Sequence, residues 1–270
     1  MKNLQCKDHL VSGQLFELVP HTKYAAFLTQ PIPELLEPYY DHPDYISHQQ
    51  ESQGFFYALY GFLRRLNITY KLKLLNRFVP KKGNLLDFGA GTGAFVQAAQ
   101  NKDWTAKGYD PLIHQGKQKE NLFVSDWVKS KHYHCITAWH VLEHLPSPQD
   151  FLKQAHASLT QNGVLVIALP NCASWDAQHY QADWAAYDVP RHLWHFTPNG
   201  IKEMANEFGF ELVQQHPLHM DAYYIALLSE KIQKNPFPWL RALINGTRSN
   251  CKANRTGMYS SLIYVFKKAK

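Results

Sequence analysis

Apolar segments of strand length alternate with helical segments through the middle of the chain. The apolar segments have the residue types of buried strands, and they cover residues 84–88, 105–109, 122–124, 133–139 and 164–169. Helical spacing predicts helices at 94–101 and at 147–159, where Ser147 is the expected N-cap and Pro148 the first helical residue. Strands that alternate with helices predict an α/β fold with a parallel, doubly wound sheet, which binds its ligands at the carboxyl ends of the strands.

The flanking segments have a different pattern. Residues 1–80 contain four prolines between positions 31 and 43, which interrupt regular structure, followed by apolar residues at helical spacing from 51 to 78. We therefore expect an irregular and then helical cap, 1–80, over a main domain, 81–270. Beyond residue 170 the pattern predicts a long loop, a helix at 198–208, a strand at 210–216, a helical insertion at about 221–250 and a last strand at 260–267.

The composition is that of a globular protein. Hydrophobic residues make up 45% and supply a sizeable core, and 19% charged residues are too few for a disordered chain. The first residues lack the apolar segment of a signal peptide, and no apolar run reaches the length of a membrane span, so we expect a cytoplasmic protein. The four cysteines are scattered, which indicates reduced thiols rather than disulfides or a zinc ribbon. A net charge of +6 leaves nucleic acid a minor alternative among partners.

A glycine-rich turn joins the first strand of the predicted sheet to the helix that follows it. The segment is Asp87-Phe88-Gly89-Ala90-Gly91-Thr92-Gly93, and such a turn lets a ligand approach bare backbone at a helix N-terminus. Gly89, Gly91 and Ala94 also fit the fingerprint of dinucleotide-binding proteins. The glycines alone therefore do not distinguish NAD from another nucleoside cofactor.

Acidic residues at the ends of three strands favour S-adenosylmethionine (SAM) at this turn. Asp87 would repel the pyrophosphate of NAD, whereas SAM carries an ammonium and a sulfonium group. Asp110 ends the second strand, 23 residues after Asp87, where an acid accepts hydrogen bonds from both ribose hydroxyls. Asp126 follows the third strand, where it can accept a hydrogen bond from the adenine amine, with Trp127 against the ring.

Residues 84–170 resemble a class I SAM-dependent methyltransferase domain. The match rests on the D-x-G-x-G-x-G turn, on the acids after strands two and three, and on the segment Trp139-His140-Val141-Leu142-Glu143-His144 after strand four. This last segment is similar to the subgroup that includes O-methyltransferases of the ubiquinone pathway. The resemblance implies SAM as methyl donor and a Rossmann-like seven-stranded sheet whose last strand, here 260–267, is antiparallel. It leaves the methyl acceptor open.

The resemblance also implies a cofactor site. Related chains often begin with a small cysteine-based zinc module, but here only Cys6 and His9 remain, so we predict no zinc there. The segment Tyr45-Ile46-Ser47-His48 resembles a cap motif that such proteins place near the cofactor. The cofactor-binding residues that we predict are Asp87, Phe88, Gly89, Ala90, Gly91, Gly93, Asp110, Pro111, Asp126, Trp127, Trp139, His140 and His48.

The segment His140-x-x-Glu143-His144 also fits an H-x-x-E-H zinc motif. That motif requires a helix that turns both histidines to one face and a distant third ligand, whereas here it follows directly on a predicted strand. This context disfavours a metalloprotease. Some O-methyltransferases that the chain resembles use a divalent ion, but we expect Glu143 and His144 to bond to neighbouring loops, and we predict no metal ligand.

A second group of titratable and aromatic residues follows the fifth strand, in the segment 184–196. Methyl transfer is an in-line displacement that requires alignment, exclusion of water and, for some acceptors, removal of a proton. Histidine has a suitable unperturbed pKa for such a base, and we predict His192 for this role, with His195 second. Arg191 is expected to hold an anionic acceptor or to pair with Asp188.

Aromatic side chains in the same segment, Tyr187 and Trp184 among them, are suited to form a wall against a ring or a sugar. We therefore expect a SAM-dependent methyltransferase that acts on an O or N atom of a small molecule or a glycan, while RNA as acceptor rests on the net charge alone. Two other classes remain open. The three acids Asp87, Asp110 and Asp126 argue against a SAM-fold module without catalysis, and Asp87 argues against an NAD-linked oxidoreductase.

Overall fold

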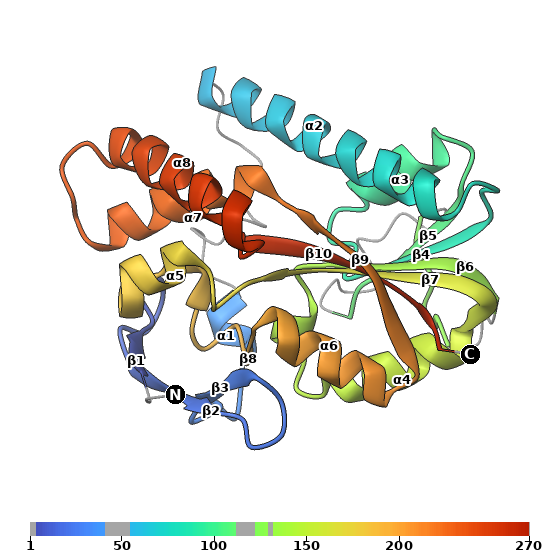
Figure 1. Cartoon of the computed structure of the whole chain (residues 1–270), viewed down its shortest axis with the longest axis horizontal. Coiled ribbons are helices and arrows are strands. Elements are labelled where there is room, and N and C mark those ends of the chain that lie inside the picture. The colour runs from blue at the N-terminus through green and yellow to red at the C-terminus, as the bar shows by residue number, and fades with distance from the viewer. Residues whose placement is uncertain (1–3, 41–54, 112–121, 129–131, 270) are drawn as a thin grey trace.

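A six-stranded sheet forms the centre of the protein (Figure 1). The computed structural model describes residues 4–40, 55–111, 122–128 and 132–269, and for 55–64 the backbone only. The strands of the sheet are β4 (Asn84–Phe88), β5 (Thr105–Tyr109), β6 (Tyr133–Trp139), β7 (Leu159–Pro170), β9 (Phe210–Pro217) and β10 (Ser261–Lys268). They lie in the order β5-β4-β6-β7-β10-β9, with β4, β5, β6 and β7 parallel and β10 antiparallel to both of its neighbours. The predicted α/β sheet with an antiparallel last strand is therefore confirmed.

The predicted count of seven strands is not confirmed for the part of the chain that the structure describes. The segment 122–124 forms one parallel bridge, between Phe123 and Gly108 of β5, at the outer edge of the sheet. The amide of Gly108 donates to Leu122 and the amide of Val124 donates to Gly108, at 2.7 and 2.9 Å. Two backbone hydrogen bonds on a single residue hold this segment beside β5 without extending it into a strand.

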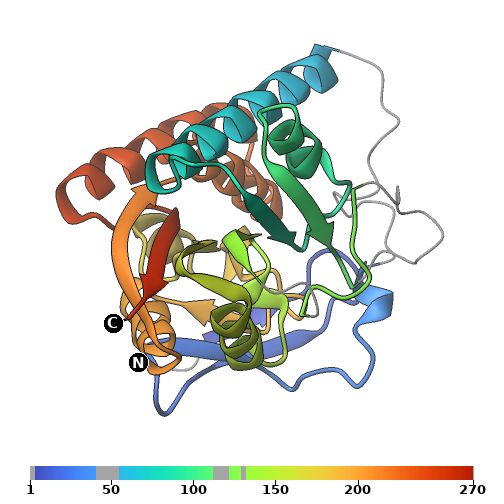
Figure 2. The same cartoon turned by 90° about the vertical axis from the view of Figure 1, so that its right-hand side faces the viewer.

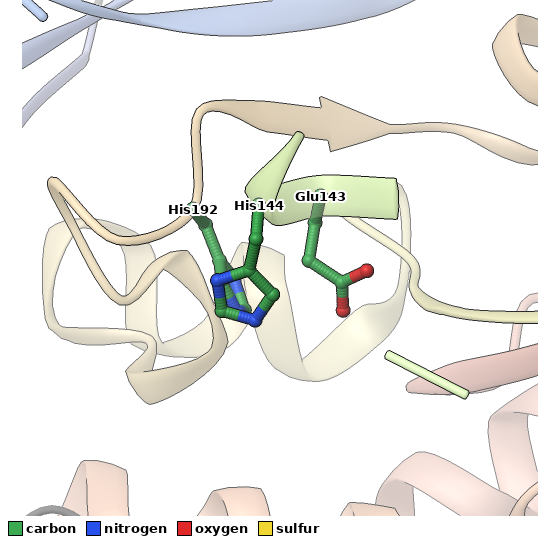
Figure 3. Close-up of side chains that lie close together, drawn as sticks. All are labelled: Glu143, His144 and His192. Carbon is green, nitrogen blue, oxygen red and sulfur yellow. The ribbon is translucent and has the colours of Figure 1, made fainter. Parts of the chain in front are cut away.

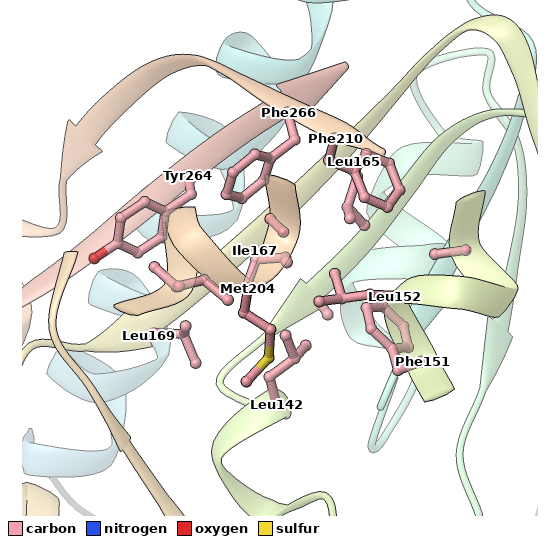
Figure 4. Close-up of a cluster of buried hydrophobic side chains, with 14 of the residues drawn as sticks. Leu142, Phe151, Leu152, Leu165, Ile167, Leu169, Met204, Phe210, Tyr264 and Phe266 are labelled. Carbon is pink, nitrogen blue, oxygen red and sulfur yellow. The ribbon is translucent and has the colours of Figure 1, made fainter. Parts of the chain in front are cut away.

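Helices cover both faces of the sheet (Figures 1 and 2). The helices α2 (Phe55–Phe78) and α3 (Ala94–Gln100) pack on one face, and α4 (Pro148–Ser158) and α6 (Pro198–Glu207) pack on the other. Leu165 and Ile167 of β7 face α4 and α6 (Figure 4), whereas Val166 between them faces α2 and α3. Strands that are buried on both faces have nearly continuous apolar sequences, which is why the sequence predicted them well.

The N-terminal segment differs from the irregular and then helical structure that the sequence predicted. It contains β1 (Leu4–Lys7), β2 (Leu15–Pro20) and β3 (Ala26–Gln30), then the short helix α1 (Glu37–Tyr40). The three strands form an antiparallel sheet that is completed by β8 (Trp194–Phe196). Because β8 lies far along the chain, its pairing with β3 leaves no local pattern in the N-terminal sequence.

The predicted helical insertion is a pair of helices, α7 (His219–Ile232) and α8 (Pro238–Thr256), which pack on each other. Together with α5 (Trp175–Tyr180) they share an apolar cluster with the N-terminal sheet. The 3-10 turns are η2 (Leu142–His144), η3 (Gln181–Asp183) and η4 (Ala185–Tyr187). The four cysteines are free, as expected. Among the described residues, no helix combines the length and the apolar composition that crossing a bilayer requires.

Candidate functional site

The glycine turn after β4 lies where the strand order changes direction, since β5 and β6 flank β4 on opposite sides. Gly89, Gly91 and Gly93 have φ values of +74°, +51° and +74°. A Cβ added to Gly89 would lie 2.4 Å from Cγ2 of Val141, whereas a Cβ added to Gly91 meets no described atom within 4 Å. Gly89 is thus required for close packing against the loop after β6, and Gly91 presents its backbone to open space.

Asp110 lies beside this bare backbone. Its Oδ2 accepts a hydrogen bond from the amide of Gly91 at 2.8 Å, so the carboxylate at the end of β5 faces the turn. Further along the same edge, Oδ1 of Asp126 accepts a hydrogen bond from the amide of Val128 at 2.9 Å. The two acids therefore follow β5 and the bridge at Phe123, in the order that a bound nucleoside requires.

Trp127 is buried in the core next to the turn. Its ring packs against those of Phe88, Tyr109 and Phe151, with centroid distances of 5.4, 6.4 and 6.0 Å. Of the predicted cofactor residues, His48 lies outside the described part of the chain, together with the rest of the 45–48 motif.

Asp87 is almost completely buried, with 2% of its surface exposed. Its Oδ1 accepts a hydrogen bond from Oγ1 of Thr137 on β6 at 2.7 Å. Burial raises the pKa of Asp87 to about 7, against the opposing effects of Thr137 and of Lys71 on α2. Burial also lowers the pKa of Lys71 to about 8, and its Nζ lies 4.3 Å from the centre of the Trp139 ring. A cationic ligand beside Asp87 would stabilise the ionised carboxylate.

The open backbone at Gly91, the acid bonded to its amide and the buried Asp87 together fit a cofactor that combines a nucleoside with a cationic group. Sequence reasoning predicted these three residues but missed Lys71 and Thr137. Nothing in their local sequence distinguishes them, because one lies mid-helix and the other mid-strand.

His140, directly after β6, bridges two carboxylates. Its Nδ1 is 3.4 Å from Oε1 of Glu143, and its Nε2 is 3.2 Å from Oδ2 of Asp221 at the start of α7. Burial alone would lower the pKa of His140, but the two carboxylates raise it to about 9. The ring is therefore a cation at neutral pH, and it connects the end of the sheet to the α7–α8 pair. The role of Asp221 was not predicted from the sequence.

Glu143, His144 and His192 lie together beyond His140 (Figure 3). One potential ligand atom from each residue lies within 4.8 Å of the others. Burial would raise the pKa of Glu143, but the three histidines around it lower that pKa. Burial, aided by His192, lowers the pKa of His144 to about 4, so this ring is neutral at neutral pH. The structure thus brings His192, the predicted base, next to the H-x-x-E-H segment.

His195, the second predicted base, is held by the N-terminal sheet. Its Nε2 lies 2.9 Å from Oγ1 of Thr29, and this hydroxyl donates to the carbonyl oxygen of His192 at 2.6 Å. Since the hydroxyl proton is used in that bond, Nε2 of His195 carries a proton and donates it to Thr29. Burial lowers the pKa of His195 well below 6.5, so the ring is neutral.

Arg191 is 2% exposed and lies between two carboxylates. Its Nη2 donates to Oδ1 of Asp188 at 2.6 Å and to Oδ1 of Asp8 at 3.3 Å. Of the two roles that the sequence suggested for Arg191, the structure shows the pairing with Asp188. Tyr187 is also buried, with its ring edge-on to those of Trp184 and His195 at 5.0 and 5.4 Å.

A small cavity of about 10 Å³ lies between this loop and the end of β7. Its walls include Glu143, Trp184, His192, Trp194 and His195. The volume corresponds to about one water molecule. The predicted histidines and aromatic residues therefore do converge on one place, at the carboxyl ends of the parallel strands.

Comparisons with known proteins agree with the observed fold. Residues 61–215, more than half of the chain, match the family described as "Methyltransferase domain". A SAM-dependent methyltransferase from Archaeoglobus fulgidus has a similar fold, with 17% identity, a TM-score of 0.51 and coverage of 80% of this chain and 100% of that one. Magnesium protoporphyrin IX methyltransferase from Synechocystis PCC 6803, with bound S-adenosylhomocysteine, has 11% identity, a TM-score of 0.52 and coverage of 83% and 91%. No curated protein matches the sequence.

Proposed function

The chain belongs to the methyltransferase-domain family and is a class I SAM-dependent methyltransferase, and on this premise we propose that it methylates a hydroxyl or amine of a small molecule or a glycan. The family membership gives SAM, rather than NAD, as the cofactor and an enzyme rather than a binding module. The observation that supports an acceptor site is the convergence of His192 and Trp184 at the carboxyl ends of β6 and β7.

The residues that we assign to the cofactor are those around the glycine turn. Gly91 offers bare backbone, Asp110 is placed for the ribose, and Asp87 faces the cationic end. Asp126 is assigned to the adenine, and Trp139 and His140 close the site from β6. When bound, SAM supplies a methyl group on a sulfonium whose sulfur keeps the bonding electron pair on transfer. The role of the chain is then to align the acceptor, exclude water and accept the proton that the acceptor loses.

His192 is the residue that we assign to acceptor activation. Its Nδ1 lies 2.9 Å from the carbonyl oxygen of Ala186, and a carbonyl only accepts, so Nδ1 carries the ring proton of the neutral form. The lone pair is then at Nε2, which lies 4.0 Å from Oδ2 of Asp188. A fixed lone pair on a buried histidine is suited to draw a proton from an acceptor hydroxyl.

Residues 1–80 are assigned to a cap over this site. Three contacts support the assignment: Arg191 pairs with Asp8, Thr29 bonds to the carbonyl of His192, and Tyr40 donates to the carbonyl of Arg191 at 3.2 Å. All three hold the 184–196 segment from the N-terminal side. Such a cover would keep water from the transferring methyl group.

Of the two acceptor atoms, oxygen and nitrogen, we favour oxygen. The support is the similarity of the 139–144 segment to O-methyltransferases of the ubiquinone pathway. Among acceptors, hydroxylated aromatic rings and sugars suit the wall formed by Trp184 and Tyr187.

The test is release of S-adenosylhomocysteine from SAM in the presence of a panel of catechols, phenols and sugars. We expect turnover with at least one of them, and a loss of about 10²–10⁴-fold in His192→Gln with SAM binding unchanged. His179→Gln, at an exposed position of α5, is the matched control and should keep full turnover. Unchanged turnover in His192→Gln would remove the assigned role, and turnover only with RNA would overturn the acceptor class.

A further inference from the structure

We propose that Glu143, His144 and His192 form a binding site for a divalent first-row cation of the Zn²⁺ type. Two imidazoles and one carboxylate are a donor set that such ions accept, and catalytic zinc sites use three protein ligands with one position open. This set differs from the H-x-x-E-H motif, because the first histidine of that motif, His140, lies between Glu143 and Asp221. The third ligand is His192, whose ring centre lies 4.5 Å from that of His144 (Figure 3).

The carboxylate of Glu143 is buried without a hydrogen-bond donor in the described part of the chain. The residue is 1% exposed, and neither of its oxygens has a hydrogen-bond donor among the described residues. The cationic ring of His140 lies 3.4 Å from Oε1 of Glu143 through its Nδ1, but it is shared with Asp221 at 3.2 Å. It therefore offsets only part of the cost of burying this carboxylate, and Oε2 has no hydrogen-bond partner among the described residues. A cation bound by these oxygens removes that cost.

Hydrogen bonds fix the ring protons of both histidines at Nδ1. Nδ1 of His192 lies 2.9 Å from the carbonyl oxygen of Ala186, which only accepts. Nδ1 of His144 lies 3.1 Å from the carbonyl oxygen of Arg191 and also 3.1 Å from the hydroxyl of Tyr40, which itself donates to that carbonyl at 3.2 Å. With the hydroxyl proton used in that bond, both Nδ1 atoms carry the protons of the neutral rings and both Nε2 atoms hold lone pairs. A backbone carbonyl that fixes the tautomer in this way is the usual outer partner of a metal-binding histidine.

A cavity of about 10 Å³ adjoins the cluster. Glu143 and His192 line it, whereas His144 does not, and its volume suits one ion or one water molecule. The three donor atoms lie within 4.8 Å of one another. Metal–ligand distances near 2.1 Å place the donors of a tetrahedral site roughly 3.4 Å apart, so small side-chain rotations close the site.

His140 and Asp221 support the Glu143 carboxylate from outside the proposed ligand set. His140 holds Oε1 of Glu143 on one side and Oδ2 of Asp221 on the other. A ligating carboxylate that is itself fixed by a neighbour keeps its orientation, which strengthens binding. The role of the ion rests on the proposed function. A His192 lone pair that binds the ion cannot also take the acceptor's proton, so in the metal-bound protein the ion would lower the pKa of an acceptor hydroxyl at the open position, and the proton would leave to solvent water.

The experiment measures Zn²⁺ binding to the chelator-treated protein by competition with a chromophoric chelator, without any acceptor or SAM. We expect one Zn²⁺ per chain, and a loss of about 100-fold or more in affinity for Glu143→Gln and His192→Gln. His179→Gln is the matched surface control and should bind as the parent does. Co²⁺ substitution gives a second readout, because its visible absorption should show nitrogen and oxygen ligands and should change in His192→Gln. Parent-like Zn²⁺ affinity in both ligand variants, or no binding by the parent, would overturn the proposal.

These results separate the metal site from the proposed function. If the chelated protein forms S-adenosylhomocysteine at the full rate, the catalytic use of the ion is wrong while the methyltransferase assignment stands. If Zn²⁺ binds at these residues and no acceptor is methylated, the site stands and the acceptor assignment fails.

A separate surface lies at the start of α8. Around the start of α8, five apolar side chains are 43–67% exposed: Phe237, Trp239, Leu240, Leu243 and Ile244. Residues 231–260 contain six cationic residues and no acidic residue. The cations are Lys231, Lys234, Arg241, Arg248, Lys252 and Arg255, and all six are exposed. An exposed apolar patch flanked by cations on one helix is typical of a segment that lies in a membrane interface.

We infer that the start of α8 docks on an anionic lipid surface. Charge complementarity supports this occupant, because cations without acids attract phosphate headgroups, and the apolar side chains enter the acyl boundary. Trp239 and Phe237 are the types of residue that anchor at this depth. A second copy of this chain would bring six cations against six others, which disfavours self-association at this surface.

The test is co-sedimentation with phosphatidylcholine vesicles that contain phosphatidylglycerol. We expect binding that weakens with added salt, and a loss of about tenfold or more in Trp239→Ser/Leu243→Ser. Leu15→Ser is the matched control, since Leu15 is 62% exposed on the other sheet. The fluorescence of Trp239 should also shift to the blue, because the other six tryptophans are buried or half-buried. Equal binding of the double variant, or a dimer in place of vesicle binding, would overturn the inference.

Discussion

The amide of Leu193 donates a hydrogen bond to the carbonyl oxygen of Glu143 over 2.7 Å. This bond joins the loop after β6 to the loop before β8, which are 50 residues apart in the sequence. Their neighbours His144 and His192 consequently face each other edge-on. The position of His192 is thus set by backbone pairing between two loops rather than by side-chain contacts alone.

Gly89→Ala should destabilise the fold through both a clash and backbone strain. The new Cβ would lie 2.4 Å from Cγ2 of Val141 and would also occupy a left-handed conformation. We expect a loss of about 2–4 kcal/mol in the free energy of unfolding, from backbone strain and overpacking together. Urea unfolding followed by circular dichroism measures it.

Gly257→Ala is the matched control for this substitution. Gly257 has a φ of +75° and no described atom within 4 Å of an added Cβ, so it carries the strain without the clash. We expect about 1 kcal/mol there. Equal losses in the two variants would contradict the close packing between the glycine turn and the loop after β6.

Asp87 should make both folding and SAM binding depend on pH. Its pKa in the folded protein is about 7, against an ordinary value of 3.8, so its contribution to stability is full below pH 3.8 and is lost as the pH rises through 7. SAM requires the ionised carboxylate, so its affinity should rise toward pH 7 by up to about tenfold per pH unit and then level off. Lys71, with a pKa of about 8, keeps its proton through most of this range.

Calorimetric titrations with SAM at pH 5, 6 and 7 test this dependence, with Asp87→Asn as the control. The variant carries no titrating group at this position, so its affinity should change little over the same range. A parent protein whose SAM affinity falls as the pH rises would show that Asp87 does not face the cationic end of the cofactor.

Arg191→Met should cost about 3 kcal/mol of stability, because it removes the cation from Asp8, whose side chain is fully buried, and from Asp188, whose side chain is 26% exposed. Lys23→Met is the comparison, since Lys23 forms an ion pair of 2.7 Å with Glu207 at an exposed position. That change should cost much less stability than Arg191→Met. Urea unfolding gives both values, and a small loss for Arg191→Met would mean that the buried pairs do not hold the N-terminal sheet to the 184–196 segment.

The middle of the central sheet was predictable because β4, β6 and most of β7 are apolar runs that are buried on both faces. The bounds of β4, β5 and β6 agree with the predicted segments, and the N-cap at Ser147 is confirmed by its hydrogen bond from the amide of Asp150. The N-terminal sheet was not predictable in the same way. In β2, Phe16 and Leu18 point inward, but the outward position Leu15 is also apolar, so the alternation that marks a half-buried strand is weak.

The candidate site likewise has some features that the sequence predicts and others that depend on contacts between distant segments. The glycine turn and Asp110 follow directly from strand ends, and parallel strands bring their carboxyl ends together. The meeting of His192 with Glu143 depends on loop pairing across 50 residues, and the partners of Arg191 and His140 come from β1–β2 and α7. No local pattern contains such contacts, because they arise only when distant segments pack.

The most direct test of a SAM site at the glycine turn is calorimetric titration of the purified protein with SAM, S-adenosylhomocysteine and NAD, in parallel with Asp87→Ala and the exposed control Asp103→Ala. We expect SAM and S-adenosylhomocysteine to bind with one site per chain, NAD not to bind, and only Asp87→Ala to weaken SAM binding. Binding of NAD alone, or SAM binding that is indifferent to Asp87, would contradict a SAM site at the glycine turn.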